Sequence, residues 1–286
     1  MDSYLHPYNG VLLSEHRANS SYSLIKSIDV VFRRISELPA LKRHVYTQEL
    51  LDLGILDIDT SYVLSGANVP LHGAKPLTHE TRPCLMIACL LYHPDVGLIL
   101  FDTGSREDVI KSWDKEFLDC APRIWDKDIH SLPAAIKATS ADVGIRCRET
   151  DFKLAFWSCA TGIDSGLFLP NYLRADLLNW KTVSEENVTL WRGVTVHRCP
   201  GHTERSLVLE LTFRGSGTII LTGDLFHVKG NFEEGRPTGV LMRDYFEWFR
   251  SRDYGRRLVQ GTNARVYLGH ERSYFDMFEK SPKYSE

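Results

Sequence analysis

Several classes of protein are excluded by what this sequence lacks. No apolar run approaches the ~20 residues that a membrane-spanning helix needs, and the opening segment MDSYLHPYNGVLLSEH lacks the basic-then-apolar order of a secretion signal. The six cysteines are scattered and form no CxxC pair, so we expect reduced thiols and a cytoplasmic location. A formal net charge of only −3 argues against a basic nucleic-acid surface. The absence of internal repeats excludes solenoids and propellers.

The composition is that of a globular protein with a large core. Hydrophobic residues make up 43% and charged residues 25% of the 286 residues, both close to the averages for soluble proteins. Apolar residues at helical spacing predict an amphipathic helix over Tyr22–Leu38 and further helices over Asp108–Lys137 and Arg243–Thr262.

Short apolar runs between these helices predict β-strands. Such runs include LDLGILDID, SYVLSG, CLMIACLLYH, LILFDTG and FKLAFWS. CLMIACLLYH and LILFDTG flank the turn HPDVG, which predicts a hairpin. A series of strands followed by a helix occurs twice, and this order predicts a sandwich of two sheets flanked by helices. No linker is visible in the sequence, so we expect one main domain.

Three of the predicted strands end in a potential metal ligand. His202 lies in CPGHT, Asp224 in LTGD and His270 in YLGH, and a glycine precedes each ligand. Glycine at a strand end lets the chain turn and point the next side chain into a shared cleft. Imidazole and carboxylate groups suit zinc, iron or manganese.

Five segments carry a resemblance to a known family. They are LDLGILDID, YHPDVGLILFDTG, CPGHTERSL, LTGDLFHVKGNFE and YLGH. In order and spacing they resemble the metallo-β-lactamase superfamily, in the branch of the N-acyl-homoserine-lactone lactonases, from about Leu51 to Phe278. The resemblance implies an α+β fold, an αββα sandwich of two mixed β-sheets with a metal cleft at one edge. It places this domain at residues 47–286, after an N-terminal helical extension at residues 1–46.

The resemblance also implies roles for individual residues. Asp224 would bridge two metals, while His202 and His270 would each hold one. Asp102 in FDTG would be a carboxylate that orients a ligand histidine. His227 stands where the lactonases carry a tyrosine that polarises the lactone carbonyl, and an imidazole can also donate a hydrogen bond or a proton. We therefore expect Asp224 and His227 to act in catalysis.

The family's ligand run HxHxDH is degraded in this chain. The corresponding loop is SCATGIDSG. An ungapped alignment sets Cys159 at the first histidine and Asp164 at the last, whereas a slip of one residue sets Asp164 at the family's aspartate. All three histidines of the run are absent under both alignments. Asp164 survives as a possible ligand in either case.

The remaining candidates predict a single metal site. The candidate ligands are Cys159, Asp164, His202, Asp224 and His270. One divalent ion held by Asp164, Asp224 and His270, helped by His202, is chemically reasonable, with zinc first and iron or manganese also suitable.

The function expected from these residues is hydrolysis of a lactone, ester or thioester. The substrate would be a small metabolite, and we expect neither a nucleic-acid nor a membrane partner; the sequence does not indicate the oligomeric state. Two alternatives stay open. One is a metal-free descendant that binds a small molecule or a protein, and the other is an isomerase or lyase on the same fold.

Overall fold

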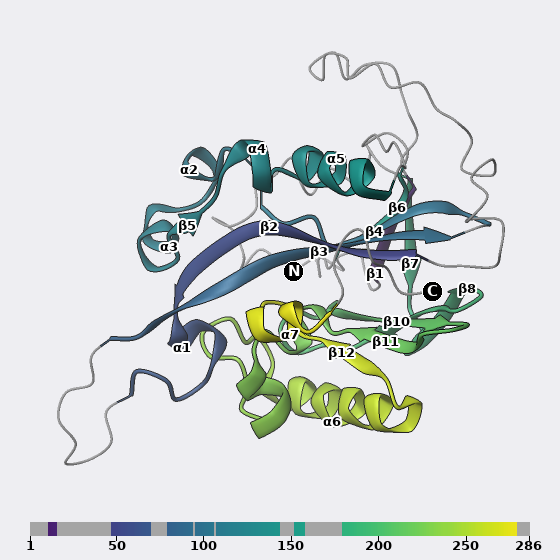
Figure 1. The fold of residues 1–286 in the computed structure, drawn as a ribbon. Helices are drawn as coiled ribbons and strands as arrows, with labels where there is room; N and C mark the ends of the chain where they lie inside the picture. The colour runs from purple at the N-terminus through teal and green to yellow at the C-terminus, as the bar shows by residue number, and fades with distance from the viewer. Residues whose placement is uncertain are drawn as a thin grey trace, which may run out of the picture.

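Two β-sheets stack face to face, with helices on the outer surfaces (Figure 1). The computed structural model describes residues 11–15, 47–69, 79–93, 95–105, 107–143, 152–157 and 179–278. This arrangement confirms the predicted αββα sandwich of two mixed sheets.

Among the described residues, the larger sheet has seven strands, with a short strand at each edge. In spatial order they are β5 (Arg123–Ile124), β2 (Thr47–Asp59), β3 (Thr81–His93), β4 (Gly97–Phe101), β6 (Phe152–Trp157), β1 (Val11–Glu15) and β7 (Asn179–Val183). β4 and β6 run parallel, and the other neighbours run antiparallel.

The smaller sheet has five strands within the part of the chain that the structure describes. In spatial order they are β12 (Arg265–Tyr267), β11 (Gly217–Leu221), β10 (Leu207–Phe213), β9 (Val194–Arg198) and β8 (Asn187–Trp191). β11 and β12 run parallel. Because the carboxyl ends of parallel strands meet at one edge of a sheet, the segments that follow β11 and β12 lie together.

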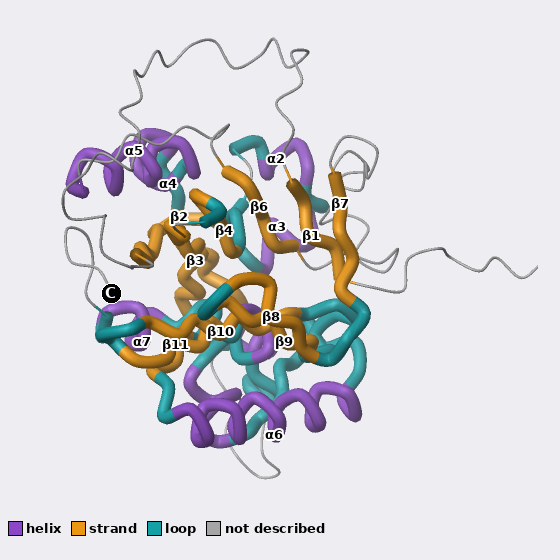
Figure 2. Tube along the Cα trace, turned by 90° about the vertical axis from the view of Figure 1, so that its right-hand side faces the viewer, coloured by secondary structure: helices purple, strands orange, loops and turns teal. Residues whose placement is uncertain are grey.

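Helices cover both outer faces of the sandwich (Figure 2). Those beside the larger sheet are α2 (Val109–Ser112), α3 (Lys115–Cys120), α4 (Lys127–His130) and α5 (Leu132–Val143), and α6 (Tyr245–Thr262) covers the smaller sheet. Short helices α1 (Thr60–Val63), η6 (Gly223–Leu225), η7 (Gly230–Glu234) and α7 (Arg272–Asp276) connect the strands. Within the described part of the chain, no helix is both long enough and apolar enough to cross a bilayer.

Both faces of the central strands are buried. In β3, Leu91 faces the opposite sheet while Leu90 packs toward α5. In β10, Leu209 lies between the sheets while Val208 packs toward α6. Successive side chains of a strand point to opposite faces. A strand with apolar layers on both sides therefore has a continuous hydrophobic sequence, as these two strands do.

Most of the predicted elements are confirmed. β3 and β4 form the expected hairpin, with Leu91 opposite Ile99, and helices occupy the ranges predicted around α2–α5 and α6. The strand predicted for SYVLSG is wrong, because this run begins with helix α1. The Asp59 side chain accepts a hydrogen bond from the Ser61 amide at 2.8 Å and so caps that turn.

The expectations for the N-terminal part are only partly within the described residues. The helix predicted over Tyr22–Leu38 lies outside them. The division into residues 1–46 and 47–286 stays a prediction. β1, which precedes residue 47, pairs with β6 and β7 in the larger sheet.

Trp248 is the largest fully buried side chain of α6, and it provides a test of this core. Trp248→Ala should lower the free energy of unfolding by about 3–5 kcal/mol, because it removes a buried aromatic ring. Phe246→Ala on the same helix is the matched control. Phe246 is 83% exposed, so loss of its ring should change stability by less than about 0.5 kcal/mol. Urea unfolding followed by circular dichroism measures both, and equal losses would contradict this packing.

Candidate metal centre

His202 stands on the loop that follows β9. Gly201 before it has a φ of +136°, and a β-carbon there would lie 2.5 Å from Trp248 Cα, so only glycine fits. Beyond His202, the Thr203 amide donates a hydrogen bond to Ser206 Oγ at 3.0 Å and closes the loop. The imidazole of His202 is thereby held at the end of the smaller sheet.

Asp224 lies in η6, directly after β11. Gly223 has a φ of +49°, and its carbonyl oxygen would lie 2.4 Å from a β-carbon built on Gly269. Glycine at position 269 therefore lets the two turns approach each other. Beneath the turn, Trp248 Nε1 donates to the Leu225 carbonyl at 2.9 Å, so the α6 core fixes its position.

His227 and His270 lie side by side on neighbouring segments. The His270 amide donates to the His227 carbonyl at 2.9 Å. His270 is also tied to β3, because its carbonyl accepts from the Leu85 amide at 3.1 Å. In return, His270 Nδ1 donates to the Leu85 carbonyl at 2.9 Å, since a carbonyl oxygen can only accept. The site thus lies where the two sheets meet.

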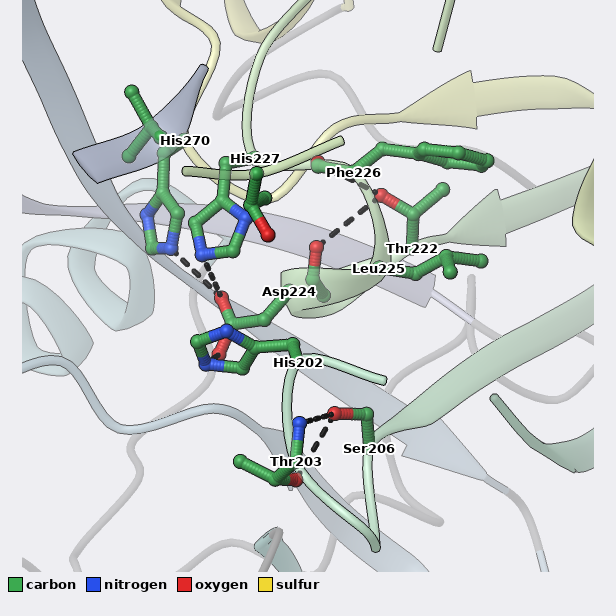
Figure 3. Close-up of polar contacts among 12 residues, drawn as sticks. His202, Thr203, Ser206, Thr222, Asp224, Leu225, Phe226, His227 and His270 are labelled. Atoms are coloured by element: carbon green, nitrogen blue, oxygen red, sulfur yellow. Dashed lines mark hydrogen bonds and ion pairs between the residues drawn. The ribbon is translucent and has the colours of Figure 1, made fainter. Parts of the chain in front are cut away.

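Three imidazole rings surround the carboxylate of Asp224 (Figure 3). His270 Nε2 lies 2.8 Å and His227 Nε2 lies 3.7 Å from Asp224 Oδ1. His202 Nε2 lies 3.4 Å from Asp224 Oδ2. The His227 ring lies between the other two, with its centroid 4.8 Å from that of His202 and 5.1 Å from that of His270.

These groups change one another's pKa values. Burial alone would raise the pKa of Asp224, but the three imidazoles outweigh it and hold this pKa well below its usual range. Burial opposes the charged form of His270, but the hydrogen bond and charge of Asp224 raise its pKa to about 9. Burial lowers the pKa of His227 well below its usual 6.5. The cluster therefore combines a carboxylate, a protonated His270 and a neutral His227.

Asp102 lies behind this cluster, at the end of β4. Its φ is +68°, and its carboxylate accepts hydrogen bonds from the Thr103 and Gly104 amides. Burial and the charge of Asp224 raise the pKa of Asp102. A small cavity of about 30 Å³ is lined in part by Asp102 and is large enough for a water molecule. The role of Asp102 in orienting a ligand histidine stays a prediction.

The donor set fits a divalent cation. The ligand atoms of His202, Asp224 and His227 all lie within 4.8 Å of one another. The separations of 3.4 and 3.7 Å from the carboxylate oxygens are long for hydrogen bonds. They are close to the about 3.3 Å between ligand atoms in a tetrahedral site with metal bonds of about 2.0–2.1 Å. Imidazole nitrogens with a carboxylate suit zinc, iron or manganese.

The structure brings together four of the predicted site residues: His202, Asp224, His227 and His270. Cys159 and Asp164 lie outside the described residues, so their part in metal binding stays a prediction. Sequence reasoning considered His227 for catalysis and not as a ligand. The position of His227 three residues after Asp224 was the available signal for a ligand. The sequence does not give the direction of its ring, because that direction depends on the turn after η6.

Comparison with known proteins gives matches in structure only. No protein-family model matches the sequence, and no curated protein matches it in sequence. A Bacillus thuringiensis AiiA variant with N-decanoyl-L-homoserine at its active site has a TM-score of 0.65 and 18% identity. The match covers 85% of this chain and 100% of that one.

Two further solved structures are similar. An N-acyl homoserine lactone hydrolase with the product N-hexanoyl-L-homoserine at its catalytic metal centre has a TM-score of 0.66 and 18% identity, over 85% of this chain and 100% of that one. A probable metal-dependent hydrolase from Staphylococcus aureus has a TM-score of 0.52 and 10% identity, over 84% of this chain and 96% of that one. The chain therefore has the metallo-β-lactamase fold. The fold is similar to that of an N-acyl homoserine lactone hydrolase, as the motifs predicted.

The Asp224–His270 pair predicts a pH-dependent stability for the metal-free protein. The pKa of His270 is raised from 6.5 to about 9, so the pair stabilises the fold fully below pH 6.5 and loses this effect as the pH rises through about 9. The free energy of unfolding in EDTA should fall over that range, and the fall should be smaller in His270→Gln.

Denaturant unfolding at a series of pH values measures this difference. His79→Gln is the control, because His79 is an exposed histidine that also contacts a carboxylate, that of Asp59. This variant should keep the pH slope of the parent protein. Identical slopes for the parent and His270→Gln would show that the pair does not titrate as stated.

Proposed function

We propose that the protein is a metal-dependent hydrolase that acts on a lactone, ester or thioester of a small metabolite. The observation that carries this proposal is the convergence of three imidazoles on one carboxylate where the two sheets meet. The similarity in fold to a lactone hydrolase, to the AiiA variant with N-decanoyl-L-homoserine at its active site and to a probable metal-dependent hydrolase supports it.

One divalent ion, zinc first and iron or manganese as alternatives, would be held by Asp224 and the imidazoles around it. When bound, such an ion polarises a carbonyl group and lowers the pKa of a water molecule to near 7. Asp164 and Cys159 stay candidates for further ligands from the loop after β6.

The protein's own groups prepare the carboxylate for this task. His270 Nε2 donates to Asp224 Oδ1, which fixes the rotation of the carboxylate and leaves Oδ2 beside His202. The Leu85 carbonyl fixes the orientation of His270 through Nδ1. The side chain of Asp224 is 33% exposed and that of His227 only 2%. A substrate would therefore approach from the Asp224 and His202 side.

A carbonyl carbon bonded to oxygen or sulfur is the substrate chemistry that we propose. Two of the similar structures hold N-acyl homoserines, one of them as the product at a catalytic metal centre. An N-acyl homoserine is the ring-opened form of a lactone. Esters and thioesters present the same carbonyl with a comparable leaving group, so the proposal includes them.

Asp224→Asn tests this function. With a panel of N-acyl homoserine lactones, aryl esters and acyl thioesters, the metal-loaded protein should turn over at least one class. The variant should lose at least about a hundredfold in kcat/KM, the effect of removing one group that stabilises the transition state. Asp253→Asn, on the exposed side of α6, should keep full activity.

Two results would contradict the proposed function. Bound metal without turnover of any substrate class would favour an isomerase or lyase. A protein produced with zinc, iron and manganese that contains none of them would favour a binding protein without catalysis. Metal analysis together with the activity panel separates these outcomes.

A further inference from the structure

The ring of His227 is buried, and hydrogen bonds from the described residues do not account for its burial. Its side chain is 2% exposed, and among the described residues no group hydrogen-bonds its buried Nδ1. Its Nε2 faces Asp224 Oδ1 at 3.7 Å, beyond the length of a hydrogen bond. Buried polar groups are nearly always paired, so this ring needs an explanation.

A cation between His227 and Asp224 would give Nε2 of this buried ring a partner. The Nε2 lone pair and the carboxylate both face the space between them (Figure 3). On the other side of the carboxylate, His202 Nε2 lies 3.4 Å from Oδ2. These three side chains form the group whose ligand atoms all lie within 4.8 Å of one another. The separations of 3.4 and 3.7 Å from the carboxylate oxygens are near those of two atoms bound to one ion.

His270 differs from the other two histidines in its contacts. Its Nε2 lies 2.8 Å from Asp224 Oδ1, which is hydrogen-bond length and short for two ligands of one ion. Its Nδ1 donates to the Leu85 carbonyl. Both ring nitrogens of His270 are therefore occupied by protein groups, and its contacts orient Asp224.

We infer that His202, Asp224 and His227 hold one divalent metal ion, with His227 in place of ligands from the degraded histidine run, while His270 positions the carboxylate from outside. This inference deepens the proposed function and shares its metal ion. It assigns His227 a ligand role instead of contact with the substrate carbonyl, in keeping with the burial of its ring. Three protein ligands leave a coordination position open, as catalytic sites require.

Metal affinity is the direct test. Zinc affinity is measured by competition with a chromophoric chelator, and the cobalt(II)-substituted protein gives visible bands that report the ligands. His227→Gln should lower zinc affinity by more than about a hundredfold, because losing even an outer partner of a ligand costs about 10–100-fold. It should also shift the cobalt bands.

Three comparisons make the result specific. His197→Gln removes another buried histidine, on β9, which contacts Glu210 and Tyr254, and it should keep the parent's affinity. His270→Gln should lower affinity by no more than about a hundredfold and leave the cobalt bands unchanged. In His227→Gly, added imidazole should restore zinc binding, which also separates loss of a ligand from a failure to fold.

Two results would overturn the inference. One is a His227→Gln protein with the zinc affinity and cobalt spectrum of the parent. The other is a His270→Gln protein with altered cobalt bands and no zinc binding, which would make His270 the ligand. Neither readout involves turnover, so a metal-loaded parent that hydrolyses nothing would contradict the proposed function and leave this ligand assignment standing.

Discussion

The reciprocal hydrogen bonds between Leu85 and His270 connect the two sheets at the candidate metal centre. Leu85 belongs to β3 in the larger sheet, and His270 follows β12 in the smaller one. One bond fixes the backbone and the other fixes the imidazole, so the relative position of the sheets sets the direction of Nε2. Asp224 then takes its orientation from that nitrogen. The geometry of the centre therefore depends on how the two halves of the sandwich meet.

Much of the fold follows from the sequence because the central strands are apolar on both faces. Such strands give continuous hydrophobic runs that local pattern detects. The strand predicted for SYVLSG was wrong because the Asp59 side chain caps a helical turn there. Such a local hydrogen bond outweighs a weak strand pattern. The helix expected before residue 39 and the loop with Cys159 and Asp164 lie outside the described residues, so the sequence remains the sole basis for those expectations.

The site was predictable only in part, for a physical reason. His202, Asp224 and His270 could be found because each follows a strand and a glycine. That Asp224 and His270 meet depends on the parallel pairing of β11 and β12, which is a long-range contact without a local signal. The burial of His227 depends on the turn after η6. Resemblance placed a catalytic group at this position, whereas the contacts of the ring favour a ligand.

The charge balance of the centre also differs from that of a site rich in carboxylates. In the described part of the chain, Asp224 is the carboxylate at the point where the rings converge, and the protonated His270 beside it adds a positive charge. A divalent ion there keeps a net positive charge, which favours the negative charge that develops on a carbonyl oxygen during acyl transfer.

Trp248 links the centre to the rest of the molecule, since it packs against Gly201 and its indole donates to the Leu225 carbonyl. The loop of His202 and the turn of Asp224 thus share one support in α6. An ion that binds only the native form adds about 4 kcal/mol to stability when its concentration is a thousand times its dissociation constant. Scarcity of the ion would then empty the metal centre and also destabilise the whole fold, so the amount of folded protein would follow the metal supply.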